Sequence, residues 1–453
     1  MNNTTFLVFM ITLLTSCFLL SCKTSQRAAE SEYLSDQTSQ SKLVETDTFL
    51  QQPPSFSAAA KSFDKKIHSA FLASGENIKN IMPLEGGTLT LHFDRFDLAE
   101  LNYTVHFQHC DYKFNASKLN TSEFQEGEDF LEITQFEPSF NTARDFIHYQ
   151  YSFPNQDVQF LLSGNYMLFV KHPNTDSIVL QLPFYIVDNK VQVKGRITDA
   201  TNPRFKFSHQ NLNLSVNTGD CIIENPYSNF KVLVSQNNRE DTIRELPPPS
   251  MVNGREINYS SSDELHFKAG KEFRYIDLRD IDNPEARIKE IKYIGNHALA
   301  ILKEEPIRSF KSNISLADFN GKFQISTTQA EQIHSRAEYV KVKVTLGQRE
   351  QYNYDDIHII GAFNNWQPSP ESKLHYNGIN KNYEVNLELK QGYYNFEFVT
   401  TAKGTFSPSS RTLTEGHHPD TENDYYVYIY TIEPGQNHYS LVGTHIINSR
   451  KTR

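Results

Sequence analysis

Apolar residues at every second position are the feature of this sequence that most constrains its fold. Clear runs of this kind lie at residues 101–109, 340–346 and 383–389. Because successive side chains of a β-strand point to opposite faces, each run predicts a strand with one buried and one solvated face. Turn residues recur between such runs, and no long stretch has helical periodicity. We therefore predict an all-β chain built from tandem β-sandwich domains.

The N-terminal segment has the pattern of a bacterial lipoprotein signal. Phe6–Leu20 is apolar but too short to span a bilayer comfortably, and Cys22 follows it after one small residue. We expect a signal peptide at residues 1–22, lipidation of Cys22, and a flexible tether at residues 23–64. Cys17 is a second candidate for processing. An uncleaved anchor or a non-lipidated signal peptide stays open, because the first five residues contain no Lys or Arg.

Polar breaks divide the rest of the chain. Asp188–Lys190 is one such break, and Lys311–Arg336 has the composition of a connector. We expect an N-terminal β-sandwich at 65–190, a middle β-sandwich at 191–310, a connector at 311–336, a C-terminal β-sandwich at 337–445 and a tail at 446–453.

The net charge bears on the kind of partner, and the cysteines bear on whether a disulfide forms. The net charge is −10 with no block of Lys or Arg, so we expect no nucleic-acid partner. Cys110 and Cys221 could pair in an oxidising compartment or remain as two buried free thiols, and the sequence leaves both alternatives open.

Motifs of common catalytic sites are absent from the sequence. It contains no phosphate loop, no His-Glu-x-x-His, no Gly-x-Ser-x-Gly and no Cys-x-x-Cys. His106, His109 and Cys110 include possible metal ligands, but residues three apart on a strand point to opposite faces. We expect the acidic run at 123–132 and the segment His417–Asp420 to face solvent. The sequence therefore predicts a protein that is not an enzyme, with no metal, no cofactor and no small-molecule substrate.

One segment suggests binding. Gly361–Trp366, followed by Gly392–Phe398, resembles the immunoglobulin-like early-set carbohydrate-binding modules that hold glycogen or starch. In those modules an exposed tryptophan stacks on a sugar, which implies binding roles for Trp366 and Phe406. The family commonly has a basic residue where Glu397 stands, so glycan capture is weakened here. Alternatively, Trp366 packs against the core of its own module or against a neighbouring domain.

The order of several segments resembles one family from about residue 67 to residue 443. This family is the plug protein of the type IX secretion system of Bacteroidota, also catalogued as a domain of unknown function. The segments that carry the resemblance are His109–Asp111, Ser122–Gly127, Ser139–Thr142, His148–Asn155, Leu162–Tyr166, Gly270–Tyr275, Leu389–Tyr394 and Thr421–Tyr425.

The resemblance implies a non-enzymatic function. The family is thought to close the periplasmic side of the large translocon barrel in the outer membrane. We therefore expect that barrel as the partner, and a location on the periplasmic face of the outer membrane with a lipid anchor at Cys22. The alternative is a glycan-binding outer-membrane lipoprotein of a polysaccharide-uptake system that uses Trp366 and Phe406.

Overall fold

The alternating runs of the sequence form strands where the pattern predicts them. In the computed structural model, β26 (Tyr339–Gly347) pairs antiparallel with β29 (Asn382–Lys390). β6 (Thr104–Cys110) covers most of the alternating run at residues 101–109. Val340, Val342, Val344 and Leu346 are all fully buried, whereas Lys341 between them is exposed. The period of two therefore determines which face of the sheet packs inward.

The structure describes residues 59–128, 130–200, 202–260, 262–311, 318–328 and 333–451. The predicted signal peptide, with Cys17 and Cys22, and most of the predicted tether lie outside these residues. No described helix has the length and apolar character needed to cross a membrane. Helices in the described part are one turn long: α2 (Thr121–Phe124), α3 (Ile333–Arg336), η1 (Glu240–Thr242), η2 (Asp263–Leu265) and η3 (Ala362–Asn364). The prediction of an all-β fold of β-sandwiches is confirmed.

The first sandwich consists of two antiparallel sheets around one apolar core. One sheet has the order β1-β13-β12-β6-β8, with β4 on β13, and the other has the order β3-β2-β5-β10-β9. The strands not yet given bounds are β1 (Lys61–Ser62), β2 (Ile67–Ser74), β3 (Asn77–Ile78), β4 (Ile81–Pro83), β5 (Leu89–Arg95), β8 (Leu131–Glu132), β9 (Gln135–Pro138), β10 (Ile147–Phe153), β12 (Gly164–Lys171), β13 (Ile178–Val187) and the separate pair β7 (Gln125–Gly127) and β11 (Val158–Phe160). Because β1 pairs with β13, the last residues of the predicted tether belong to this sandwich.

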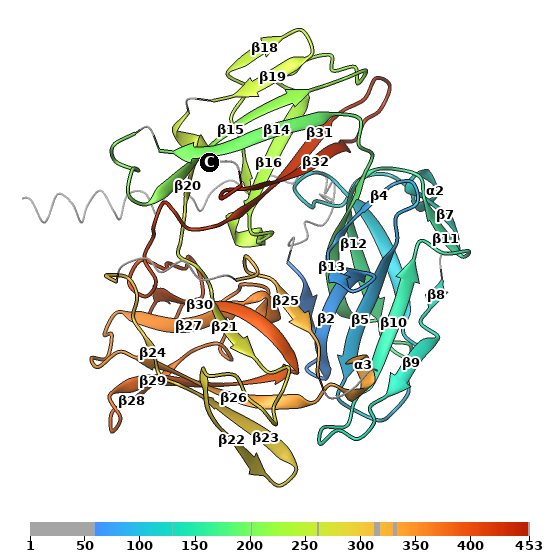
Figure 1. Cartoon of the computed structure of the whole chain (residues 1–453). Helices are drawn as coiled ribbons and strands as arrows, with labels where there is room; N and C mark the ends of the chain where they lie inside the picture. Colours follow the sequence, from blue (N-terminus) through green and yellow to red (C-terminus); the bar gives the residue numbers. More distant parts are fainter. Residues whose placement is uncertain are drawn as a thin grey trace, which may run out of the picture. The chain divides into compact units, whose positions relative to one another are not determined.

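The middle sandwich is completed by strands from the C-terminal end of the chain. One sheet has the order β14-β15-β19-β18, with β20 on β15, and the other has the order β17-β16-β31-β32. Its strands are β14 (Gln192–Asp199), β15 (His209–Asn217), β16 (Phe230–Gln236), β17 (Arg244–Glu245), β18 (Met251–Asn253), β19 (Glu256–Tyr259), β20 (His266–Lys268), β31 (Asp424–Thr431) and β32 (Ser440–Asn448). Figure 1 shows the red β31 and β32 beside the green strands of this sandwich.

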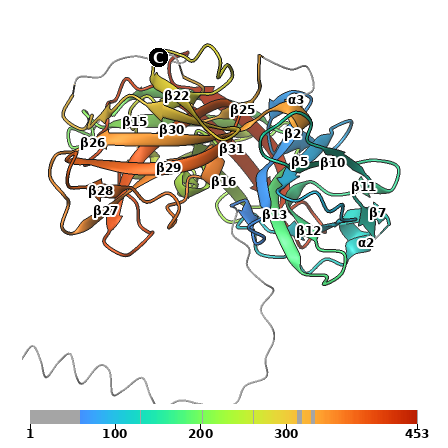
Figure 2. The same cartoon turned by 90° about the horizontal axis from the view of Figure 1, so that it is seen from below.

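The third sandwich is inserted between β20 and β31 of the middle one. Its sheets have the orders β21-β30-β25, with β27 on β30, and β22-β23-β26-β29-β28, with β24 on β26. The strands not yet given bounds are β21 (Arg274–Asp277), β22 (Ile288–Ile294), β23 (His297–Leu302), β24 (Glu305–Pro306), β25 (Phe323–Ile325), β27 (Asp355–Gly361), β28 (His375–Asn377) and β30 (Gly392–Ala402). Figure 2 shows β26, β29 and β30 of this sandwich from below.

This strand pairing divides the chain differently from the predicted linear order of domains. Residues 274–306 were expected in the middle sandwich, but β21 pairs with β30 and β23 pairs with β26 of the third. Residues 424–448 were expected in the third sandwich and in the tail, but β31 pairs with β16 along its whole length. Alternation along one strand carries no information about which distant strand lies beside it, so the sequence pattern could not reveal the insertion.

The insertion predicts how the chain responds to truncation. Removal of residues 424–453 deletes two strands from the four-stranded sheet and core residues that include Tyr425, Ile429 and Val442. At about 1.5–3 kcal/mol for each buried apolar side chain, the loss is comparable to the roughly 5–15 kcal/mol by which domains are stable, so we expect the middle sandwich to unfold. Limited proteolysis with mass spectrometry then finds cleavage within residues 192–268. A chain that ends at Ser449 keeps both strands and is the control. Protection of 192–268 in the shorter chain would contradict the inserted topology.

Candidate functional site at the sandwich junctions

The tryptophan predicted to bind a sugar is buried at the junction of the middle and third sandwiches. Trp366 follows η3, is 6% exposed, and packs against Phe273, Ile360 and Val399. The guanidinium carbon of Arg239, from the middle sandwich, lies 4.1 Å from the centre of the Trp366 ring. A cation at this distance over the ring face is attracted by the ring quadrupole. Trp366 therefore serves as an internal contact between two sandwiches.

This placement corrects the expectation of an exposed aromatic platform. Arg239 lies over the Trp366 ring and Phe273 packs against it, so only 6% of Trp366 is exposed, too little for a sugar to stack on. Phe406 is 44% exposed, and its ring centre lies 5.7 Å from that of His358 in an edge-on contact. The alternative weighed from the sequence, that Trp366 packs against its own module and a neighbouring domain, agrees with the structure.

Glu397, which stands where the carbohydrate-binding modules have a basic residue, is the acidic partner of two arginines. The Arg239 guanidinium donates a hydrogen bond of 2.6 Å to the Glu397 carboxylate, and Arg411 lies 3.1 Å from the same oxygen. The Arg239 and Glu397 side chains are 1% and 2% exposed. Arg239 also forms two hydrogen bonds, of 2.9 and 2.7 Å, with Asp241. The cation of this ion pair is therefore Arg239 of the middle sandwich, and its carboxylate is Glu397 on β30 of the third.

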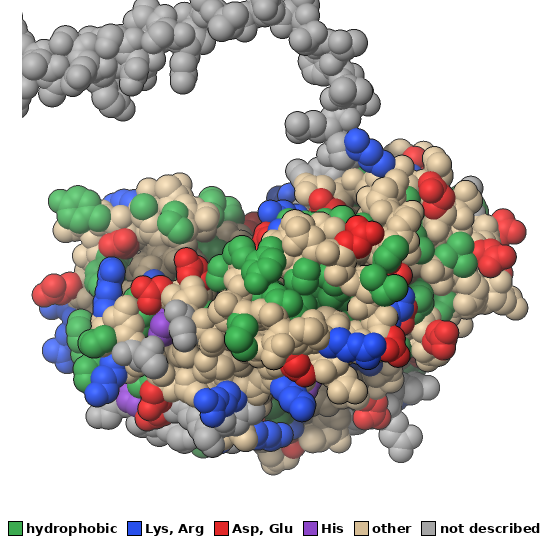
Figure 3. All heavy atoms as spheres, turned by 90° about the horizontal axis from the view of Figure 1, so that it is seen from above, with side chains coloured by type: hydrophobic (Ala, Val, Ile, Leu, Met, Phe, Trp, Pro, Cys, Tyr) green, Lys and Arg blue, Asp and Glu red, His purple; other side chains and the backbone are tan. Residues whose placement is uncertain are grey.

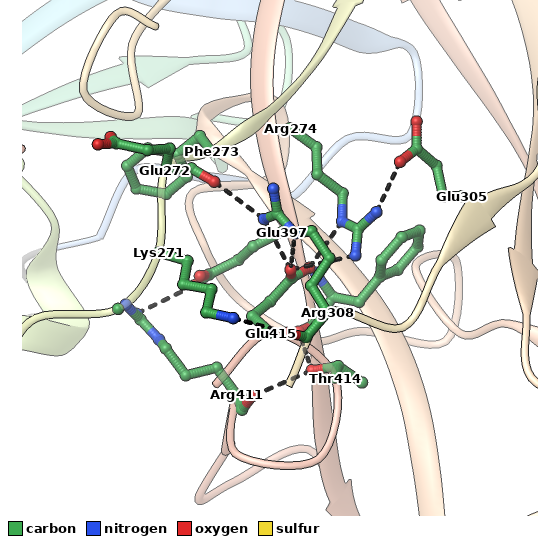
Figure 4. A network of polar contacts seen from close by, with 12 residues as sticks. Lys271, Glu272, Phe273, Arg274, Glu305, Arg308, Glu397, Arg411, Thr414 and Glu415 are labelled. Carbon is green, nitrogen blue, oxygen red and sulfur yellow. Dashed lines mark hydrogen bonds and ion pairs between the residues drawn. The ribbon is translucent and has the colours of Figure 1, made fainter. Parts of the chain in front are cut away.

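A second ion-pair network lies where the chain enters the third sandwich. Figure 4 shows the Arg274 guanidinium between the carboxylates of Glu305 and Glu415. The distances from its nitrogens to these two carboxylates are 2.6 and 2.9 Å. Arg308 donates a further hydrogen bond of 2.7 Å to Glu415. Burial alone would raise the pKa of Glu415, but Arg274 and Arg308 hold it at about 2, so this carboxylate is charged at neutral pH.

The two linkers between the middle and third sandwiches are hydrogen-bonded to each other. We call residues 269–273 the outgoing linker and residues 403–423 the returning linker. The Gly270 carbonyl accepts hydrogen bonds from the backbone N–H of His418, at 2.8 Å, and from the hydroxyl of Thr421, at 3.0 Å. The side-chain amide of Asn423 donates to the Ala269 carbonyl at 3.0 Å. The two chain segments that connect the middle and third sandwiches therefore lie side by side and are held together by hydrogen bonds.

Buried charge also joins the first sandwich to the third. Asp94 on β5 accepts hydrogen bonds of 2.6 Å from the Lys390 ammonium, the Tyr339 hydroxyl and His148 Nδ1. The Asp94 and Lys390 side chains are 1% and 2% exposed. Burial raises the pKa of Asp94, but Lys390 and His148 outweigh this effect and lower it to about 2.

Two further histidines lie beside this group. His92 Nδ1 is 3.1 Å from His148 Nε2, and the His334 ring stacks on both His92 and His148, with ring centres 4.5 and 4.7 Å apart. Burial lowers the pKa of His92 to about 3 and that of His334 to about 4. Both imidazoles are therefore neutral at physiological pH.

The first and middle sandwiches meet through aromatic contacts. The Tyr185 and Tyr428 rings stack with their centres 4.7 Å apart, and the Tyr430 hydroxyl donates to Asn165 at 2.8 Å. These residues belong to a buried cluster formed by both sandwiches, whose members are Cys110, Phe114, Met167, Phe169, Tyr185, Val187, Leu233, Tyr428, Tyr430 and Leu441. Each pair of sandwiches thus has its own buried junction.

A cleft of about 710 Å³ lies where the three junctions converge. Its lining includes Leu72 and Asn80 from the first sandwich, Arg239 from the middle one, and Phe319 and Trp366 from the third. The cleft is thus lined by residues of all three sandwiches.

The structure also places several other residues that the sequence singled out. His109 and Cys110 are fully buried, and burial raises the pKa of the Cys110 thiol to about 12, so the thiol is not reactive. Both Cys110 and Cys221 are free cysteines. His417 Nδ1 accepts a hydrogen bond of 3.1 Å from the Gly270 N–H, which places this histidine in the contact between the linkers.

Sequence reasoning missed Arg239 and His334, because neither lies in a motif. A signal did exist for other junction residues. Several segments that carry the family resemblance contain them, namely Asn165 in Leu162–Tyr166, Arg274 in Gly270–Tyr275, Lys390 in Leu389–Tyr394 and Asn423 in Thr421–Tyr425.

The fold and its junctions define a class: a protein of three β-sandwiches that are joined through buried contacts. Comparison with known proteins adds the family. Residues 67–188 match the sequence model described as type 9 secretion system plug protein 1st domain. The first sandwich therefore matches the first domain of the type IX secretion system plug family, the family that the resemblance implied.

A solved structure shares the fold over most of the chain. It is the crystal structure of a hypothetical protein from Parabacteroides merdae ATCC 43184, with a TM-score of 0.80 and 24% sequence identity. The match covers 86% of this chain and 99% of that chain. At this identity the likeness shows a common fold alone. The comparison with curated proteins found no match.

The pair Arg239–Glu397 predicts a large effect of a small substitution. Glu397→Gln removes the negative charge and leaves Arg239 and Arg411 buried with less compensation. Removal of one partner of a buried pair costs about 3–5 kcal/mol, which we expect as a loss of unfolding free energy in urea titrations. The control is Glu388→Gln, whose partner Arg144 is 35% exposed, and its effect should stay within about 1 kcal/mol. Equal effects of both substitutions would contradict the expected cost of leaving a buried charge without its partner.

Glu272 in the outgoing linker predicts a dependence of stability on pH. Burial raises its pKa from 4.5 to about 7, so the folded state holds this proton more tightly than the unfolded state does. This contribution, about 3 kcal/mol, is fully present below pH 4.5 and is lost as the pH rises through about 7. Glu272→Gln should therefore reduce the fall in unfolding free energy between pH 4.5 and 7. An unchanged pH profile would show that Glu272 titrates normally in the folded protein.

Proposed function

We propose that this protein is a non-enzymatic plug, which closes the periplasmic side of the large outer-membrane translocon barrel of the type IX secretion system. The family match over residues 67–188 carries the proposal. That match supports a role in type IX secretion and an association with the periplasm or outer membrane. The barrel as direct partner, and closure as the action, are the further steps proposed here.

The junctions supply the mechanical property that a plug needs. A body that blocks a wide pore must keep its shape while it is docked, and each pair of sandwiches here shares buried contacts. The Arg239–Glu397 and Lys390–Asp94 pairs fix specific atoms of neighbouring sandwiches to each other. Bending at a junction would separate these charges in a medium of low dielectric constant, which is unfavourable.

The surface suits an interface that forms and separates. Figure 3 shows a face on which a group of hydrophobic side chains is surrounded by acidic and basic ones. Large hydrophobic side chains such as Phe310, Ile379 and Phe207 are well exposed. Non-obligate interfaces are about as apolar as ordinary protein surface, so a mixed surface of this kind supports docking that is reversible.

A lipid at Cys22 would keep the body near its partner. The tether between Cys22 and the first described strand, β1, contains about 40 residues, which confines the body to the vicinity of the membrane and raises its local concentration there. Lipidation of Cys22 and anchoring in the periplasmic leaflet of the outer membrane are both parts of the proposal. The glycan-binding alternative loses its main support, because Trp366 is buried beneath Arg239.

Permeability of the outer membrane tests the proposal. We expect deletion of the gene, in a strain that retains the barrel, to admit a large antibiotic that the intact outer membrane excludes. The wild-type gene should restore exclusion. A gene with Cys22→Ser should restore it only partly, because loss of the anchor lowers the local concentration of the plug.

Affinity purification from detergent-solubilised outer membranes provides the matching binding test. The barrel should be recovered with the tagged wild-type protein and not with an unrelated periplasmic protein that carries the same tag. Unchanged permeability after deletion, together with no recovery of the barrel, would contradict the proposed plug.

A further inference from the structure

Three histidines from two sandwiches converge at the junction of the first and third sandwiches. His92 comes from β5, His148 from β10 and His334 from α3. Figures 1 and 2 both place α3 beside β5 and β10. One ring nitrogen from each histidine can be chosen so that the three lie within 4.8 Å of one another. We propose that these histidines form a zinc site that joins the first sandwich to the third.

The arrangement of His92 and His148 favours a metal ligand pair. In the antiparallel register, His148 is opposite Asp94, two residues from His92 on the same strand, so all three side chains lie on one face of the sheet. His92 Nδ1 and His148 Nε2 are 3.1 Å apart. Zinc–nitrogen bonds of about 2.0–2.1 Å in a tetrahedral site place neighbouring ligand nitrogens about 3.3 Å apart. In the absence of metal these two nitrogens share a hydrogen bond, and their spacing is close to that of two zinc ligands, so zinc would replace the shared proton.

Asp94 orients one of the ligands. Its carboxylate accepts a hydrogen bond of 2.6 Å from His148 Nδ1, which leaves the lone pair of His148 Nε2 directed at His92. A carboxylate behind a ligating histidine fixes the tautomer and raises the basicity of the ligand. Asp94 also balances the charge of Lys390, whose ammonium lies 2.6 Å from the carboxylate. The metal would thus be close to an ion pair whose two charges cancel, so that it meets no net positive charge there.

His334 supplies the third ligand and the route of entry. It is partly exposed, whereas His92 and His148 are buried, so an ion can approach from the side of α3. Its ring stacks on the other two, with ring centres 4.5 and 4.7 Å away, so ligation requires this ring to turn out of the stack. Three imidazole nitrogens with a fourth position for water suit a divalent first-row metal, and zinc has no geometric preference that would oppose this arrangement.

Such a site would strengthen the contact between two sandwiches. A metal bound by β5, β10 and α3 stabilises only the state in which the first and third sandwiches are joined, because separation removes His334 from the other two ligands. This inference does not depend on the proposed plug function, since it concerns only a contact within the chain.

Zinc titration of the purified full-length protein tests the site. After treatment with a chelator, we expect calorimetry with zinc chloride to give one ion per chain, and zinc to raise the midpoint of thermal unfolding. His334→Gln should weaken zinc binding at least tenfold and abolish the shift of the midpoint. The matched control is His375→Gln, at an exposed position of β28, which should bind zinc as the wild type does.

Cobalt provides a second measurement that does not rely on stability. The wild type should develop the visible absorption of tetrahedral cobalt, and His92→Gln should lose it. Circular dichroism and urea unfolding of each metal-free variant establish that it is folded before it is titrated. Absence of zinc binding by the wild type would overturn the proposal. So would equal binding by the wild type and by folded His92→Gln and His334→Gln.

Discussion

Charges buried between sandwiches are the interaction on which the arrangement of this protein depends. Arg239 and Glu397 face each other across the junction of the middle and third sandwiches, and Asp94 and Lys390 do so across the junction of the first and third. Such pairs add little net stability, because each ion has lost its hydration. They do penalise every arrangement in which one charge is buried without its partner. The apolar contacts therefore hold the sandwiches together, while the ion pairs select one relative orientation.

The inserted topology reinforces this selection. The chain leaves the middle sandwich after β20, builds the whole third sandwich, and returns to form β31 and β32. Two covalent crossings restrict rotation of one sandwich against the other more than one crossing would. Because the outgoing and returning linkers are hydrogen-bonded at Gly270 and Ala269, neither crossing moves independently of the other. Arg274 and Glu415 add a buried ion pair at the same place.

A body built this way fits a role that depends on shape. The charged groups of the Arg239–Glu397 and Asp94–Lys390 pairs at these junctions are occupied by one another. Trp366 is covered as well, since its ring lies beneath Arg239 and against Phe273. The family match over the first sandwich agrees with such a role in type IX secretion. The histidine cluster at the junction of the first and third sandwiches is where the binding of an ion could modulate the same rigidity.

The sequence by itself determined the local structure, because alternation along a strand is a property of neighbouring residues. The runs at 340–346 and 383–389 became β26 and β29, and the all-β class followed from such runs. The order of short segments was also enough to indicate the family. Only the tertiary structure decided that β31 pairs with β16 and that Trp366 is covered by Arg239. It also brought together His92, His148 and His334. These contacts join residues far apart in the chain, and their partners are selected by the packing of whole sheets, which no local pattern encodes.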